Sequence, residues 1–172
     1  MSNTPTYSLW LEPGGDIGYK LKEQIQKLSK KYETPKFSPH LTLLGSLKGS
    51  ETELTSLTNT LASSGSPFTV HLTKAGYRDR FYQSLFIHAE ESSELMELRN
   101  IATELFEVVE DGFMPHLSLM YGDMAQDKKQ RILNLIGREF YIRFKAKHLA
   151  LVQTTGTPEQ WKRIHTAVFK ER

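Results

Sequence analysis

Apolar and polar residues alternate in several short stretches of this chain, which is the pattern of a β-strand with one buried face. We predict strands over five such stretches, residues 7–11, 68–73, 84–89, 141–152 and 163–169. The first of them is followed by Pro13-Gly14-Gly15, a sequence that breaks regular structure. The chain is therefore expected to be rich in β-strands.

Four other stretches carry apolar residues three or four positions apart, which is typical of a helix with one buried face. We predict helices beginning at Ile17, beginning at Ser50 and ending before Gly65, over residues 93–108, and over residues 126–137. The second begins with a capping box formed by Ser50 and Glu53. Another capping box, Thr157 to Gln160 with Pro158 at the first helical position, predicts a short additional helix.

A seven-residue pattern occurs twice, about half the chain apart. Phe37-Ser38-Pro39-His40-Leu41-Thr42-Leu43 is repeated as Phe113-Met114-Pro115-His116-Leu117-Ser118-Leu119, with five of the seven positions identical. Proline favours extended geometry in the residue before it, so each copy is expected to start a strand. Side chains alternate along a strand. Each histidine and the hydroxyl residue two positions later therefore share one face, while the leucines share the other.

Two such strands facing each other would bring two imidazoles and two hydroxyls to one cleft. In-line phosphoryl transfer needs a base at the entering oxygen and an acid at the leaving oxygen, and histidine suits both roles because its ordinary pKa of about 6.5 lies near neutrality. We predict that His40 and His116 are the catalytic pair, in an order that the sequence leaves open. Thr42 and Ser118 are predicted to donate hydrogen bonds to the non-bridging phosphate oxygens. This scheme needs neither a cofactor nor a metal, and no further histidine or carboxylate stands at a spacing that would complete a zinc site.

The order of the predicted elements places one copy of the motif in each half of the chain. We predict an α+β fold class and a bilobal molecule, in which two pseudo-symmetric antiparallel sheets are flanked by outer helices around a central cleft. No stretch is rich enough in Gly, Ser or Pro to act as a linker. Residues 1–172 are therefore expected to form a single domain of two interleaved lobes.

Composition narrows the range of partners. Lys and Arg total 22 against 20 Asp and Glu, a net charge of +2, whereas a high-affinity nucleic-acid binder would carry a strong basic stripe. The absence of cysteine excludes disulfides and a thiol nucleophile, and it fits a reducing compartment. The N-terminus lacks the build of a secretion signal, and no apolar run approaches the roughly 18–20 residues of a membrane span. We expect a soluble cytoplasmic monomer that acts on a small anionic substrate.

The two motifs resemble those of the 2H phosphoesterase superfamily, which is named after two His-x-Thr/Ser motifs. Within it, the chain is most similar to the plant and fungal cyclic phosphodiesterases. The similarity extends over nearly the whole chain, in Tyr7-Ser8-Leu9-Trp10, Phe37 to Thr42, Met114 to Tyr121, Leu149-Ala150-Leu151 and the segment around Trp161. The resemblance implies the bilobal fold. It also implies opening of ADP-ribose 1″,2″-cyclic phosphate to the 1″-phosphate and of nucleoside 2′,3′-cyclic phosphates to 2′-phosphates, in the clean-up after tRNA splicing.

The same resemblance implies roles for individual residues. His40 and His116 match the family's catalytic pair, and Thr42 and Ser118 match its phosphate-binding hydroxyls. Three aromatic residues match positions that line the family's substrate pocket or the loop above it, namely Trp10, Tyr121 and Tyr82. The stretch from Arg78 to Tyr82 carries charges that the plant members lack, and the loop cysteines of those members are absent, so a disulfide cannot gate this loop.

Three alternatives remain open at this point. Another branch of the superfamily acts on RNA ends or on 2′–5′ linkages. A non-catalytic nucleotide-binding module would keep the cleft and lose turnover. A structural repeat would use its histidines only at strand starts, and it predicts that the two imidazoles point away from each other.

Overall fold

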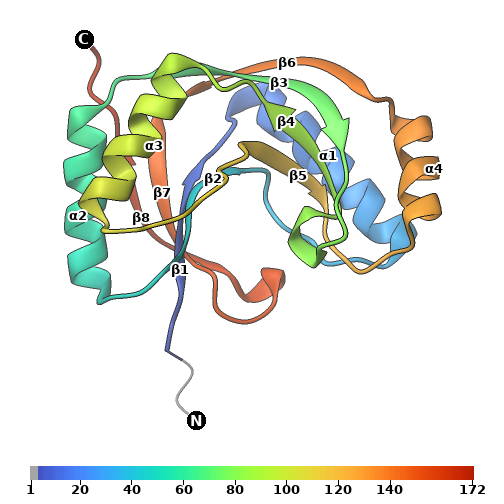
Figure 1. Cartoon of the computed structure of the whole chain (residues 1–172), viewed down its shortest axis with the longest axis horizontal. Helices are drawn as coiled ribbons and strands as arrows, with labels where there is room; N and C mark the ends of the chain where they lie inside the picture. Colours follow the sequence, from blue (N-terminus) through green and yellow to red (C-terminus); the bar gives the residue numbers. More distant parts are fainter. Residues whose placement is uncertain (1–3) are drawn as a thin grey trace.

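The computed structural model describes residues 4–172 and contains eight strands and four α-helices within that range (Figure 1). The strands are β1 (Tyr7–Leu11), β2 (Leu41–Leu47), β3 (Phe68–Gly76), β4 (Leu85–Ala89), β5 (His116–Met120), β6 (Glu139–Ala146), β7 (His148–Gln153) and β8 (Lys162–Val168). The helices are α1 (Gly15–Tyr32), α2 (Glu51–Ser64), α3 (Ser93–Leu105) and α4 (Gln126–Ile136), with 3₁₀ turns η1 (Phe81–Gln83) and η2 (Pro158–Gln160). The α+β class predicted from the sequence is therefore confirmed.

All eight strands belong to one curled antiparallel sheet in the order β6-β3-β4-β5-β2-β1-β7-β8. The prediction of two separate sheets was wrong, because β2 and β5 pair with each other in the middle. That junction is short, with a single pair in register, Leu41 opposite Leu117. Each half therefore keeps four strands of its own, and the two halves meet at the two motifs.

Helices α1 and α3 each pack on the half of the sheet that does not contain the strand preceding them in the chain. Helix α1 follows β1 in the chain but packs on β5 and β6, whereas α3 follows β4 but packs on β2 and on α2. Figure 1 shows α2 and α3 together over one half and α1 and α4 over the other. This exchange repeats in both halves, which fits a duplicated strand-helix-strand-helix unit.

Two of the four described α-helices, α2 and α3, begin at a serine side-chain cap. The Ser50 hydroxyl accepts a hydrogen bond from the Glu53 N–H, and the Ser92 hydroxyl does the same for Leu95. In α1 the apolar stripe predicted from the sequence is buried, with Leu21, Ile25 and Leu28 facing the core. The predicted box at Thr157 is present and opens η2.

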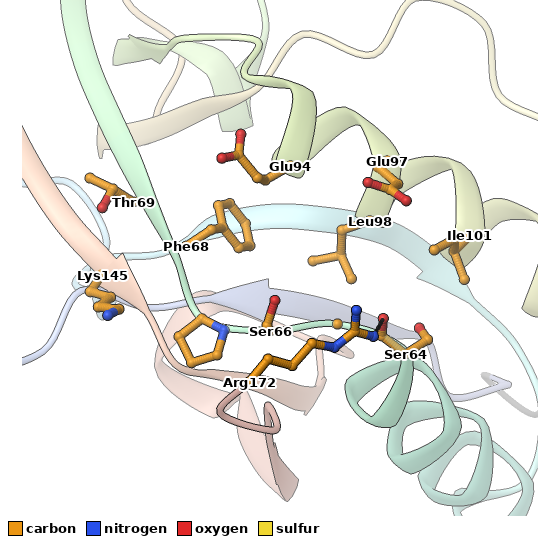
Figure 2. Close-up of a pocket in the computed structure, with 12 residues that line it drawn as sticks. Ser64, Ser66, Phe68, Thr69, Glu94, Glu97, Leu98, Ile101, Lys145 and Arg172 are labelled. Atoms are coloured by element: carbon orange, nitrogen blue, oxygen red, sulfur yellow. Dashed lines mark hydrogen bonds between the residues drawn. The ribbon is translucent and has the colours of Figure 1, made fainter.

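Where the end of α2, the start of β3 and helix α3 meet, the outer layer leaves a cavity of about 440 Å³ (Figure 2). Glu94 and Glu97 of α3 lie on one side of it, and Arg172 reaches the Ser64 carbonyl on the other. No residue of either motif lines this cavity. This cavity is therefore distinct from the place where the two motifs meet.

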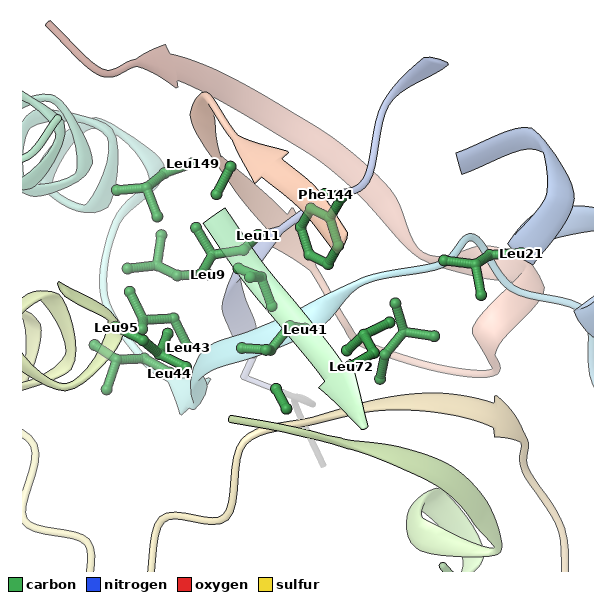
Figure 3. Packing of buried hydrophobic residues seen from close by; sticks show 14 of the residues in the cluster. Leu9, Leu11, Leu21, Leu41, Leu43, Leu44, Leu72, Leu95, Phe144 and Leu149 are labelled. Carbon is green, nitrogen blue, oxygen red and sulfur yellow. The ribbon is translucent and has the colours of Figure 1, made fainter. Parts of the chain in front are cut away.

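The core is a layer of aliphatic side chains between the sheet and the helices (Figure 3). It includes the motif leucines Leu41, Leu43, Leu117 and Leu119, each at most 1% exposed. Burial of one such side chain stabilises a fold by roughly 1.5–3 kcal/mol. The leucines thus hold both motif strands in place, as their alternation with the polar positions predicted.

One further prediction needs correction. Residues 141–152 do not form a single strand, because the chain leaves the sheet at Lys147 between β6 and β7. Strand β6 pairs with β3 at one edge of the sheet, while β7 pairs with β1 and β8 in the other half. The burial pattern changes at the same point, from alternating in β6 to continuously buried in β7. Within residues 4–172, no helix is long and apolar enough to cross a membrane.

Candidate active site

The pairing of β2 with β5 sets the layout of the site. Leu41 lies opposite Leu117 in antiparallel register. By continuation of that register, His40 lies across from Ser118, and Thr42 lies across from His116. Each histidine thus faces the hydroxyl of the other motif, and the histidines form a diagonal pair, an arrangement that brings Cβ atoms to within about 8 Å of each other.

The two imidazoles are oriented in the same way. His40 Nδ1 lies 2.7 Å from the Ser38 carbonyl oxygen, and His116 Nδ1 lies 2.8 Å from the Met114 carbonyl oxygen. A carbonyl can only accept, so each Nδ1 carries the proton and each Nε2 is left for other partners. Ser38 and Met114 occupy one of the two motif positions that differ between the copies, and each contributes only its backbone carbonyl to this arrangement, which explains why the side chain at this position is free to vary.

His40 is the more deeply buried of the pair, with 5% of its surface exposed. Its ring stacks on Trp10 with 3.6 Å between centroids and 8° between planes. Burial lowers the pKa of His40 from 6.5 to about 4, with a smaller lowering from His116, while the hydrogen bond to Ser38 opposes it. His40 is therefore neutral at pH 7.

His116 is only partly buried, at the first position of β5. Its nearest aromatic neighbour, Phe86, lies 5.1 Å away at an angle of 59°, so the two rings are not stacked. Burial lowers the pKa of His116, His88 and Arg78 lower it further, and the Met114 carbonyl opposes the shift. Because His116 is more open to water than His40, it is the easier of the two to protonate.

The hydroxyls of Thr42 and Ser118 differ in whether they already donate a hydrogen bond within the protein. The Ser118 hydroxyl donates to the Tyr82 carbonyl at 3.2 Å. The Thr42 hydroxyl makes no hydrogen bond with any residue of the described range 4–172. Thr42 is thus ready to donate to a ligand, whereas Ser118 has to leave Tyr82 first.

A cavity of about 470 Å³ opens over these groups. All seven residues singled out from the sequence line it, His40, Thr42, His116, Ser118, Trp10, Tyr82 and Tyr121. The two imidazoles thus share one cavity, which contradicts the structural-repeat alternative, since that alternative requires them to point apart.

The aromatic residues occupy distinct places in the cavity. One face of Trp10 is covered by His40, so Trp10 supports the imidazole. Tyr121 is 3% exposed and stacks on Phe37 at 3.8 Å, and burial raises the pKa of its phenol. Tyr82 is 49% exposed at the edge of the cavity and is the most accessible of the three.

Sequence reasoning missed several residues of the cavity wall. Trp161 lies 5.8 Å from Trp10 and 5.9 Å from both Tyr82 and Tyr121, measured between ring centroids, so it completes an aromatic cluster. The others that line the cavity are Thr6, Ser8, Gly45, Ser46, Gln83 and Thr154. Alternation along β1 signals Ser8, because it shares a face with Trp10. Trp161 follows the predicted capping box and lies in a stretch that carries the family resemblance, but neither signal placed it in the cavity.

Arg99 of α3 connects the two motif segments from behind. Its guanidinium is buried, donates to the Leu43 carbonyl of β2 and pairs with Glu110 at 2.8 Å. It also lies over the Phe113 ring at 4.5 Å. Leu43 and Phe113 belong to different copies of the motif, so this single side chain helps to fix their relative position.

The donor set of the site argues for acid–base chemistry carried out by the protein's own side chains. Among residues 4–172, no group of three or more His, Cys, Asp or Glu side chains converges closely enough to hold a metal ion. The cavity offers two imidazoles and several hydroxyls, among them those of Thr42 and Ser118. These groups can exchange protons with an oxygen ligand and hydrogen-bond to an anion.

Comparisons with known proteins agree with this geometry. The family described as "Cyclic phosphodiesterase-like protein" matches residues 6–169. A cyclic phosphodiesterase of Arabidopsis thaliana is 23% identical over 166 residues, which cover 92% of each protein.

Two solved structures have a similar fold. One is TT0787 of Thermus thermophilus, with a TM-score of 0.69, 17% identity and coverage of 95% of this chain and 97% of that one. The other is E. coli LigT in complex with 3′-AMP, with a TM-score of 0.69, 16% identity and coverage of 97% and 99%. At these identities, the structural matches speak for the fold alone.

Proposed function

The chain belongs to the cyclic phosphodiesterase-like family of the 2H phosphoesterase superfamily, and we propose that it hydrolyses small cyclic phosphodiesters. The observation that carries the proposal is the matched pair of imidazoles on one cavity, each held through Nδ1 by a backbone carbonyl and each left with a free Nε2. A phosphate between them would have a proton acceptor on one side and a proton donor on the other.

His40 acts as the base in this scheme. Its burial keeps it neutral at pH 7, so its Nε2 carries a lone pair that can accept a proton from water. The water oxygen forms a bond to phosphorus as one ring P–O bond breaks. The reverse assignment would require the more deeply buried imidazole to carry the charge, and burial disfavours that form.

His116 acts as the acid. Its Nε2 gives a proton to the ribose oxygen that leaves phosphorus, so one water is consumed, and the original protonation states return by exchange with solvent. The substrate's negative charge favours the imidazolium form of His116. Thr42 and Ser118 donate to the non-bridging oxygens, on which charge gathers as the water attacks.

The substrates that we propose are those of the family pathway, ADP-ribose 1″,2″-cyclic phosphate and nucleoside 2′,3′-cyclic phosphates. In the first, the bond to the 2″-oxygen breaks and the 1″-phosphate remains. In the second, the bond to the 3′-oxygen breaks and the 2′-phosphate remains. The relatives support a nucleotide as ligand, since E. coli LigT is described in complexes with 3′-AMP, ATP and NADP⁺. The Tyr82–Trp161 side of the cavity offers aromatic surface for a base.

A phosphorus-NMR assay on both substrate types tests the proposal by identifying the ester bond that opens. We expect a single monoester from each substrate, and a chelator should leave the rate unchanged. A cyclic nucleotide that binds without forming product would favour the non-catalytic module. Faster opening of an RNA with a 2′,3′-cyclic end than of a cyclic mononucleotide would favour the RNA-end branch.

A further inference from the structure

A second cavity of about 440 Å³ lies beside the catalytic one. Trp10 and Trp161 line both cavities, so both indoles belong to the wall that the two cavities share. Phe37 and Ser38, the first two residues of the first motif, form another part of the wall of this second cavity. A ligand in the second cavity would therefore lie close to a substrate bound between the histidines.

The second cavity is positively charged. Lys22 of α1, Lys36 before β2 and Arg163 of β8 reach it from three separate elements, against one carboxylate, Glu159. The net charge of the whole chain is only +2, so this is a local concentration of positive charge. Such a concentration favours an anion.

The basic groups differ in whether they are already paired. Arg163 is held by Glu12 at 2.8 Å to Oε1, and Glu159 accepts a hydrogen bond from the Lys36 backbone N–H at 3.0 Å. Neither Lys22 nor Lys36 forms a side-chain ion pair within residues 4–172. Lys22 and Lys36 thus line the cavity without an ion-pair partner in the described chain, and Glu159 is the one carboxylate among the lining residues.

We propose that this cavity is a second anion subsite, which binds a phosphate or diphosphate carried on the 5′ side of the same ribose whose cyclic phosphate lies between His40 and His116. This inference rests on the proposed function. A cyclic phosphate and a 5′-phosphate on one ribose are separated by the width of that sugar, and the two cavities share Trp10 and Trp161 in their walls. Lys22 and Lys36 are then specificity-determining residues, because they distinguish a nucleotide with a second phosphate from a plain nucleoside cyclic phosphate.

The test uses a matched pair of substrates, adenosine 2′,3′-cyclic phosphate with and without a 5′-diphosphate. We expect the wild-type protein to prefer the diphosphate by about tenfold in kcat/KM at low salt, mainly through KM, since two partly exposed charge contacts contribute modestly and are screened by salt. In the double variant Lys22→Gln, Lys36→Gln the ratio of the two kcat/KM values should fall to near one. Lys27 and Lys147 are also exposed and line neither cavity. The control Lys27→Gln, Lys147→Gln removes the same charge and should keep the wild-type ratio.

Equal kcat/KM values for the two substrates in the wild-type protein, or an unchanged ratio in the Lys22, Lys36 variant, would overturn the subsite. A dinucleotide with a 2′,3′-cyclic end identifies the source of the second phosphate. If it is preferred over the diphosphate, the subsite serves an RNA end, and if it is not, the subsite serves a free nucleotide.

A binding measurement separates failure of the subsite from failure of the proposed function. The chain has two tryptophans, and both line the two cavities, so intrinsic fluorescence reports on a ligand in either cavity and the Lys22, Lys36 variant identifies a signal from the second. If no cyclic substrate is hydrolysed, a saturable fluorescence change with ADP that is lost in the Lys22, Lys36 variant still supports the subsite. No change in the wild-type protein, or the same change in the variant, refutes it.

Discussion

Replacing Trp10 by alanine tests what keeps His40 neutral. The indole stacks on the imidazole at 3.6 Å and acts on it in two opposite ways. It excludes water from one face of His40, which disfavours the charged form and lowers the pKa. Its π-face would also attract an imidazolium, which raises the pKa.

The magnitudes decide which effect is larger. The pKa of His40 is lowered from 6.5 to about 4, which corresponds to about 3.4 kcal/mol in favour of the neutral form. A cation–π contact contributes about 0.5–2 kcal/mol in the opposite direction. Loss of water therefore dominates. Because Trp10 covers one face of His40 and lines two cavities, alanine at this position lets water reach the imidazole, and we expect the pKa of His40 in Trp10→Ala to rise from about 4 toward its ordinary value of 6.5.

Two measurements follow this change. Titration of the His40 ring by nitrogen-15 NMR gives the pKa directly. The acidic limb of the pH profile of kcat/KM reports it through activity, because the base must be neutral and activity rises as pH increases through the pKa of His40. The limb should move to higher pH in Trp10→Ala. Trp10→Phe keeps an aromatic face against His40, so its limb should stay closer to that of the wild-type protein.

A folded Trp10→Ala protein whose His40 titrates at or below the wild-type value would refute this reasoning, since stacking rather than burial would then control the charge. Removal of a buried tryptophan typically costs about 3–5 kcal/mol of stability, so thermal unfolding has to be followed alongside. Only values from the folded variant count in the comparison.

Three other predictions concern the groups around this pair. His40→Ala and His116→Ala should each lower kcat by about 10²–10⁴ with circular dichroism unchanged, and near-normal turnover in either would contradict the mechanism. Thr42→Val should lower kcat by up to about 10²-fold. This loss should be larger than that in Ser118→Ala, because the Ser118 hydroxyl must first leave the Tyr82 carbonyl before it can donate to the substrate. Equal losses, or a larger loss in Ser118→Ala, would contradict this order. Arg99→Met should lower the free energy of unfolding in urea by about 2–4 kcal/mol, because Glu110 and the Leu43 carbonyl lose a buried partner; a change below about 0.5 kcal/mol would show that Arg99 does not connect the motifs.

Patterns among neighbouring residues were sufficient to predict most of the helices and strands and the polar residues of the two motifs. The starts of α2 and α3 follow from side-chain caps, and the shared face of His40 and Thr42 follows from alternation along one strand. These features depend on neighbours within a few residues. Sequence reasoning could therefore identify the polar pair of each motif and the leucines behind it.

Features that depend on distant pairing were not predictable. Whether β2 and β5 lie in one sheet is decided by contacts between residues far apart in the chain, so the expectation of two sheets failed. The break at Lys147 has a similar origin, because its two flanking strands find partners in opposite halves of the sheet. Trp161 joins the cavity through the placement of β8 beside β7, which no local pattern announces.

The difference between the two histidines also originates outside the repeated motif. A symmetric site would give both imidazoles the same pKa, whereas acid–base catalysis needs them to differ. Strand pairing places Trp10 beside Thr42 and Phe86 beside Ser118, so these two rings occupy equivalent positions in the two halves. One ring lies flat on its histidine at 8°, and the other is tilted by 59°. The duplicated motif thus supplies two equal groups, and the neighbouring strands make one of them the base.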